Sequence, residues 1–101
     1  MVHPTNYKAY FTMKALVELG DASAAEIAAK YNKGLGDSGN KPTTGRNIAQ
    51  YIYKRLMPAY AEVVGIRRPW RHHESQPGIN VYRATGAGRD FVERYATRWE
   101  A

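Results

Sequence analysis

The chain has 101 residues, of which 44% are hydrophobic, and it contains no cysteine. This length and composition predict a single folded domain over residues 1–101, and the missing cysteines exclude disulfides, cysteine-ligated zinc and thiol catalysis. Fifteen Lys and Arg residues against nine Asp and Glu residues give a net charge of +6, which indicates a polyanionic partner.

Two helices are predicted in the first third of the chain. Residues 1–5 look like a loose lead-in, and apolar residues between 6 and 19 fall at helical spacing before a glycine that ends the pattern. Ser23 and Glu26 have the spacing of a capping box, in which each side chain accepts a hydrogen bond from the backbone N–H of the other residue. This predicts a second helix over residues 24–33.

A loop and a third helix follow. Residues 34–42 are rich in turn-forming residues and predict a loop. Thr43 or Thr44 is then suited to cap a third helix, which should end near Met57 because Pro58 disfavours a helical residue before it. The apolar stripe of this helix consists of Ile48, Ile52 and Leu56.

The last third predicts a β-hairpin and a closing helix. Residues 79–84 alternate with period two, as in a strand, and Pro77 with Gly78 forms the turn before it. Thr85 is suited to cap the final helix. The apolar side of that helix carries Phe91, Val92 and Tyr95.

The order of three helices, a hairpin and a closing helix resembles a winged helix-turn-helix domain. The likeness is closest over residues 81–95, which are similar to the passage in many prokaryotic winged-helix regulators where the second wing strand leads into the closing helix. Residues 21–29 also resemble the start of the second helix in such regulators. The resemblance, of the prokaryotic, archaeal or viral regulator type, implies a mainly α fold with a small β-hairpin (α+β): three helices, a two-stranded wing and a C-terminal helix. Nine residues separate the second and third helices, where a tight helix-turn-helix has three or four.

The net charge is confined to one third of the chain. Residues 41–73 contain seven Lys and Arg residues and one acid, Glu62, which gives this segment a net charge of +6. The positive and negative charges of the remaining residues cancel. This third covers the third helix and the hairpin, the two elements that a winged-helix domain presents to DNA. A solvated surface is the ordinary explanation of a charge run, but the concentration of the whole net charge here favours a binding surface.

The face of the third helix opposite its apolar stripe carries side chains suited to reading bases. Arg pairs with guanine through two hydrogen bonds, and Asn or Gln pairs with adenine in the same way. The N-terminal end of a helix also attracts phosphate through its free N–H groups. The candidate DNA-binding residues are Thr43, Thr44, Arg46, Asn47, Gln50, Tyr51 and Lys54.

Basic residues also gather near the hairpin turn, where arginine can enter the minor groove or contact phosphates. Trp70 among them is expected to pack between hairpin and body, and stacking on a base is the alternative. The adjacent histidines do not predict a metal site, because neighbouring residues of a strand point to opposite faces and no third ligand is evident. The candidate residues are Arg67, Arg68, Arg71, His72 and His73 in the wing and Lys41 in the preceding loop.

The glycine-rich loop matches short catalytic motifs without their context. Residues 34–39 fit G-x-G-x-x-G but follow a helix rather than a strand, and Asn40 stands where a phosphate-binding loop needs lysine. Residues 36–39 resemble the nucleophile segment of trypsin-like proteases, whose triad also needs a separate His and Asp on two β-barrels. No two acids are placed for catalysis, so we expect no enzyme activity, no metal and no cofactor.

These features predict a sequence-preferring double-stranded DNA-binding protein, such as a transcriptional regulator, with the third helix in the major groove. The alternatives are an architectural protein that coats DNA and a winged-helix module that binds RNA or protein. No small-molecule effector site is evident. No apolar run reaches the roughly 20 residues that cross a bilayer, so we expect no membrane association and an intracellular location, in the cytoplasm or nucleoid.

We further expect a homodimer, because a single small module covers little DNA. The terminal helices carry the aromatic residues that could form its interface. These residues are Tyr7, Tyr10, Phe11, Tyr95 and Trp99.

Overall fold

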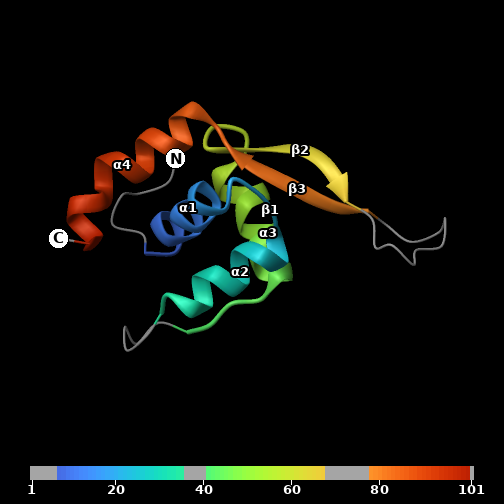
Figure 1. Cartoon of the computed structure of the whole chain (residues 1–101), viewed down its shortest axis with the longest axis horizontal. Coiled ribbons are helices and arrows are strands. Elements are labelled where there is room, and N and C mark those ends of the chain that lie inside the picture. Colours follow the sequence, from blue (N-terminus) through green and yellow to red (C-terminus); the bar gives the residue numbers. More distant parts are fainter. Residues whose placement is uncertain (1–6, 36–40, 68–77, 101) are drawn as a thin grey trace.

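Four α-helices and a three-stranded antiparallel sheet form the described part of the chain (Figure 1). The computed structural model describes residues 7–35, 41–67 and 78–100, except for the side chains of the last two. The elements are α1 (Tyr7–Leu19), β1 (Asp21–Ser23), α2 (Ala24–Lys33), α3 (Gly45–Tyr51), the π-helical turn η1 (Ile52–Leu56), β2 (Ala61–Arg67), β3 (Ile79–Ala84) and α4 (Gly86–Glu100). The predicted α+β class is therefore confirmed.

Local sequence signals set the ends of the first two helices as predicted. Gly20, at a φ of 85° that other residues rarely adopt, follows α1 and donates its N–H to the Leu16 carbonyl at 2.9 Å. The capping box before α2 is formed: the Ser23 hydroxyl accepts from the Glu26 N–H at 3.2 Å, and the Glu26 carboxylate accepts from the Ser23 N–H at 2.9 Å. Both helix boundaries agree with the sequence.

The third helix begins and ends where the sequence indicated but changes its winding. The Thr44 hydroxyl caps α3 by accepting from the Asn47 N–H at 3.1 Å. The helix continues as η1, in which the Met57 N–H donates to the Ile52 carbonyl at 2.8 Å, and it ends before Pro58. The wider π-helical turn has no counterpart in the sequence pattern, which indicates one continuous helix.

The sheet contains one strand more than the sequence predicted. β2 and β3 form the expected antiparallel pair, but β1 joins them on the other side of β3, giving the order β1-β3-β2. The prediction of only two strands is wrong because β1 has three residues, too few to show period-two alternation. Its pairing with a strand near the other end of the chain is decided by tertiary contact.

The core lies between the helices and the base of the sheet, with α1 in contact with α2, α4 and β3. Figure 1 shows β2 and β3 extending away from the helices on one side of the molecule. Tyr10 is 0% exposed within its own chain, so its predicted role in a dimer interface is wrong. The side chain of Trp99 lies outside the described residues.

The start of α4 supplies a test of the packing. The Gly88 N–H donates to the Thr85 hydroxyl at 3.1 Å, so the predicted cap is formed. A Cβ on Gly88 would overlap the Tyr60 carbonyl oxygen and lie 2.7 Å from Cε of Met13, whereas a Cβ on Gly86 would meet no atom within 4 Å. We expect Gly88→Ala to lower the free energy of unfolding by about 1–3 kcal/mol, because overpacking displaces backbone.

Gly86→Ala is the matched control, since it changes the same residue type in the same turn of helix. It should leave stability unchanged or raise it by about 0.4–1 kcal/mol, through the reduced entropy of the unfolded chain. Urea unfolding followed by circular dichroism measures both variants. Equal stability of the two variants would contradict the close packing of α4 on the Tyr60 backbone.

Candidate nucleic-acid interface

The outward face of α3 and η1 gathers most of the residues predicted to contact DNA from the third helix. Ile48 and Ile52 are 0% exposed and fix the opposite face in the core. Tyr51 lies half-buried at the edge of the outward face. The exposed side chains are those of Arg46, Asn47, Gln50 and Lys54. Within the described residues, neither Arg46 nor Lys54 enters an ion pair.

Gln50 and Lys54 stand on a ridge between two hollows. One hollow is shared with Asn47 and Arg55 and reaches α1. The other is a groove of about 440 Å³ between the helix and the β2–β3 pair, with Tyr53 and Val63 in its walls. Gln50 and Lys54 line both, so the helix surface projects between them. Both hollows are open to solvent, so the side chains between them are accessible.

Lys8 joins this surface from α1, which the sequence did not predict. Its Nζ lies 5.2 Å from the centroid of the Tyr51 ring, within the range of a cation–π interaction. It lines the first hollow together with Lys54 and Arg55. Residues 41–61 contain four Lys and Arg residues and no acid, so Lys8 extends a surface that is already positive. We call Lys8, Lys54 and Arg55 the basic cluster.

Two threonines precede α3, where the sequence predicted a phosphate contact, and both make contacts within the chain. Thr43 is 8% exposed, and its N–H donates to Oδ1 of Asn32 at 2.7 Å while its carbonyl accepts from Nδ2 at 2.8 Å. The Thr44 hydroxyl oxygen is used in the helix cap. Thr43 is therefore buried against Asn32, whereas Thr44 is exposed and stays a candidate contact.

The long connection between α2 and α3 does not hold these helices apart. Asn32 near the end of α2 binds Thr43 just before α3, which closes the intervening loop. A Cβ on Gly45 would lie 3.1 Å from Cα of Ala25, so α3 starts in close contact with the start of α2. The two helices thus pack directly on each other. Lys41 is exposed on the segment that leads into α3.

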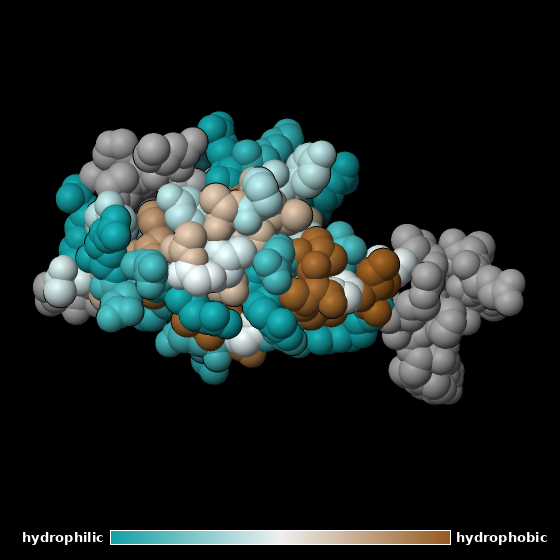
Figure 2. Space-filling model, turned by 90° about the horizontal axis from the view of Figure 1, so that it is seen from above, coloured by the Kyte–Doolittle hydropathy of each residue, from teal (hydrophilic) through white to brown (hydrophobic). Residues whose placement is uncertain are grey.

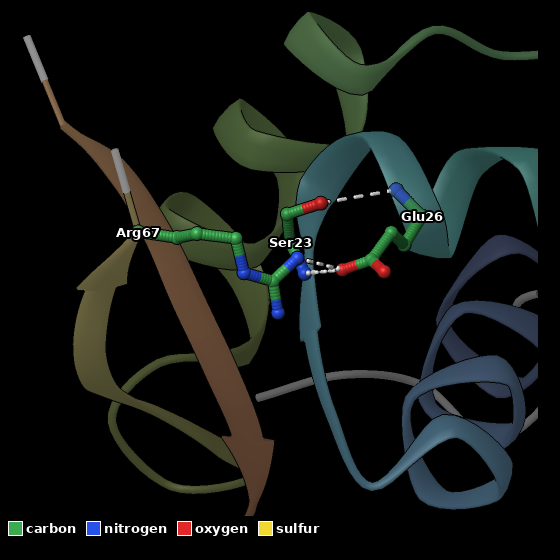
Figure 3. A network of polar contacts seen from close by, with 3 residues as sticks. All are labelled: Ser23, Glu26 and Arg67. Atoms are coloured by element: carbon green, nitrogen blue, oxygen red, sulfur yellow. Dashed lines mark hydrogen bonds and ion pairs between the residues drawn. The ribbon is translucent and has the colours of Figure 1, made fainter. Parts of the chain in front are cut away.

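Arg67, predicted to contact phosphate from the wing, has a partner in its own chain. Figure 3 shows its side chain reaching across β3 toward the start of α2. Its Nη1 donates to Oε1 of Glu26 at 2.8 Å, the same oxygen that accepts from the Ser23 N–H. Arg67 therefore links the end of β2 to the capping box. This ion pair joins residues 41 positions apart, so no local pattern indicates it.

A second arginine–carboxylate pair joins the neighbouring strands β1 and β3. Arg83 of β3 donates from Nε and Nη2 to the two carboxylate oxygens of Asp21 in β1, at 2.7 and 2.8 Å. The two residues are also register partners in the β1–β3 pair. Planar two-bond geometry of this kind fixes orientation as well as charge. Positive charge on the sheet is thus partly neutralised, while the basic cluster forms no ion pair with the residues that the structure describes.

These carboxylates predict a loss of stability in acid. The Ser23 N–H and the Arg67 guanidinium hold the pKa of Glu26 below its ordinary 4.5, and hydrogen bonds from Arg83 hold the pKa of Asp21 below 3.8. Because both pKa values are lowered by folding, the stabilisation is complete above these ordinary values and is lost as the pH falls through them toward the folded values. We expect the melting temperature to fall over this range.

The double variant Asp21→Asn, Glu26→Gln should show a shallower fall, because it lacks the two carboxylates that must be protonated. Glu93→Gln, an exposed change on α4, is the control and should follow the wild-type profile. Thermal melts between about pH 6 and about pH 2.5 measure the effect. A double variant with the wild-type profile would show that neither pair is coupled to folding.

The remaining predicted wing residues, Arg68, Arg71, His72 and His73, lie outside the described residues, as does Trp70. Across residues 7–35, 41–67 and 78–100, no group of three or more His, Asp or Glu residues is placed to hold a metal ion. No helix in this part of the chain is long and apolar enough to cross a membrane. No protein-family model matches the chain, and no curated protein matches it. Its function must therefore be inferred from these residues.

Proposed function

We propose that the chain is a winged-helix protein that binds double-stranded DNA with a preference for sequence. The observation that carries the proposal is the exposed ridge on α3 and η1, supported by a buried apolar stripe and flanked by hollows on both sides. The major groove is about 12 Å wide and admits one α-helix. We infer that α3 enters it, while the β2–β3 pair lies over the adjacent minor groove or backbone.

The side chains on the ridge divide into two chemical roles. Arg46 can donate two hydrogen bonds to guanine, and Asn47 and Gln50 can each pair with adenine. These contacts would select sequence. The basic cluster of Lys8, Lys54 and Arg55 lies beside them and would neutralise phosphates, which fixes position and orientation without reading bases.

The arrangement of elements also supports a winged-helix assignment. α2 packs directly against α3, and the antiparallel β2–β3 pair follows them in the chain and projects from the body. The closing helix α4 then packs back on α1. In this proposal the protein is a transcriptional regulator that acts by occupying its site, and an architectural role is the outcome if binding shows no sequence preference.

The proposal is tested by selecting a preferred duplex from a random pool and titrating it against random duplex at two salt concentrations. We expect the triple variant Lys8→Ala, Lys54→Ala, Arg55→Ala to reduce the slope of log K against log salt by about 0.9 for each phosphate that is no longer neutralised. The physical reason is that fewer counterions are released from DNA when fewer cations bind it.

The triple variant Arg89→Ala, Arg94→Ala, Arg98→Ala on α4 is the matched control, because it also removes three exposed positive charges but on a helix that lies away from the ridge (Figure 1). Its slope should remain that of the wild type. An unchanged slope in the basic-cluster variant, or an equal reduction in both variants, would remove this surface from the DNA interface.

A further inference from the structure

β2 is an edge strand with an unusually apolar surface. It lies at one side of the sheet in the order β1-β3-β2, and six of its seven residues are exposed. Val63, Val64 and Ile66 are 41%, 36% and 61% exposed. Figure 2 shows the hydrophobic patch that they form on the β2–β3 pair together with Ile79. The described residues thus leave a hydrophobic strand facing solvent at the sheet edge.

Such an edge is normally protected. An edge strand presents a row of unpaired N–H and C=O groups, and proteins guard it with charged residues, especially lysine, with proline, with β-bulges or with a covering element. β2 contains neither lysine nor proline, and no described strand or helix pairs with its outer side. The protective device that it does have is a bulge between Val63 and Gly65, which leaves the apolar side chains on either side of it exposed. The exposed backbone and the apolar side chains together indicate an additional strand.

The bulge determines which side chains share a face. Val63 and Ile66 are opposite Tyr82 and Asn80 of β3, on the face toward α3. Glu62 and Arg67 are opposite Arg83 and Ile79 and therefore lie on the other face. Without the bulge, residues three apart would point to opposite faces. The strand thus has an apolar pair on one face and an opposite-charge pair on the other.

We propose that a second copy of this chain pairs antiparallel along β2, about a two-fold axis perpendicular to the sheet. In this register Val63 faces Ile66 of the second copy, and Glu62 faces Arg67 of the second copy. In both of these pairs the two side chains lie on the same face, as antiparallel pairing requires. The result is a continuous sheet of six strands.

Charge supports this occupant over an arbitrary peptide. A two-fold pairing of a strand with itself fails when like charges are placed opposite each other, because such pairs are destabilising. Here the only two charged residues of β2 are of opposite sign and fall opposite each other. Arg67 is already bound by Glu26 of its own chain. The pairing of Glu62 with Arg67 of the second copy therefore serves to avoid repulsion, and the apolar contacts supply the affinity.

The geometry has a consequence for the ridge on α3. A two-fold axis perpendicular to the sheet keeps equivalent faces on the same side. The face that α3 covers is therefore on the same side in both copies. Both α3 helices then lie on one side of the six-stranded sheet. Two equivalent helices on one side suit two equivalent half-sites. The inference about pairing does not itself depend on DNA binding.

The experiment is sedimentation of the purified chain without DNA, from micromolar to millimolar concentration. We expect association to twice the chain mass of 11.4 kDa. The variants Val63→Lys, Ile66→Lys and Val63→Glu, Ile66→Glu should each remain monomeric, because like charges then face each other twice. Mixing the two variants should restore a dimer, since lysine then faces glutamate.

Leu19→Lys is the control, because it adds a charge at a position 39% exposed at the end of α1 and away from β2. It should dimerise as the wild type does. The single variant Ile66→Lys, at the most exposed of the three apolar positions, provides a second test should a double variant not fold. The proposal is overturned if the wild type is monomeric, if the variants still dimerise, or if their mixture stays monomeric. None of these results bears on DNA affinity.

Discussion

Ile52→Ala is expected to lower the free energy of unfolding by about 2–5 kcal/mol, because it removes methylene groups from a packed core and leaves a cavity. Ile52 is 0% exposed and stands where α3 passes into η1, between Ile48 and Leu56 of the same buried stripe. The reduction would be a large fraction of the stability of a domain of this size, which is about 5–15 kcal/mol.

Tyr53→Ala is the control for this measurement, since it truncates the adjacent residue of the same turn. Tyr53 is 73% exposed, so its truncation should change stability by no more than about 0.5 kcal/mol. Urea unfolding followed by circular dichroism compares the two variants. Similar reductions of the free energy of unfolding in both variants would contradict the burial of the apolar stripe. They would also contradict the outward direction of the ridge, which follows from that burial.

Arg46→Ala and Gln50→Ala are expected to reduce the discrimination between the preferred and a random duplex by about 1–3 kcal/mol each. Each change removes a side chain that can form two hydrogen bonds with one base. The lost hydrogen bonds lower the affinity only for a duplex that has this base at the contacted position. Both residues are exposed, so the fold should be retained. The measurement is a binding titration of each variant on both duplexes, beside a thermal melt.

Lys54→Ala is the matched comparison on the same helix. A phosphate contact carries no sequence information, so its removal should weaken binding to both duplexes by similar factors. If Arg46→Ala and Gln50→Ala keep the full ratio of specific to random affinity, α3 does not read sequence. An architectural protein that coats DNA would then be the better description.

Features that depend on neighbouring residues were predictable from the sequence. The capping box of Ser23 and Glu26, the Thr44 cap and the helix end before Pro58 are all formed. The buried stripe of the third helix is also as predicted, with exposures of 0% to 1%. Each of these signals lies within a few residues of the structure it determines, because helix ends are satisfied by adjacent side chains.

The candidate site was only partly predictable for the same reason. The outward direction of Arg46, Asn47 and Gln50 follows from the buried stripe, since a helix has a fixed period. The burial of Thr43 depends instead on Asn32, eleven residues earlier, and the presence of Lys8 depends on α1 lying beside Tyr51. No local pattern indicates that Thr43 is buried or that Lys8 belongs to the surface.

The sequence by itself determined where the helices begin and end, which helix faces are apolar, and that the positive charge falls in one third of the chain. Only the tertiary structure decided that β1 pairs with β3, that Glu26 holds Arg67 and that Tyr10 is buried. The physical reason is distance along the chain. A cap or an apolar stripe is complete within a few residues, whereas an ion pair or a strand pair between distant segments exists only once the whole core has brought them together.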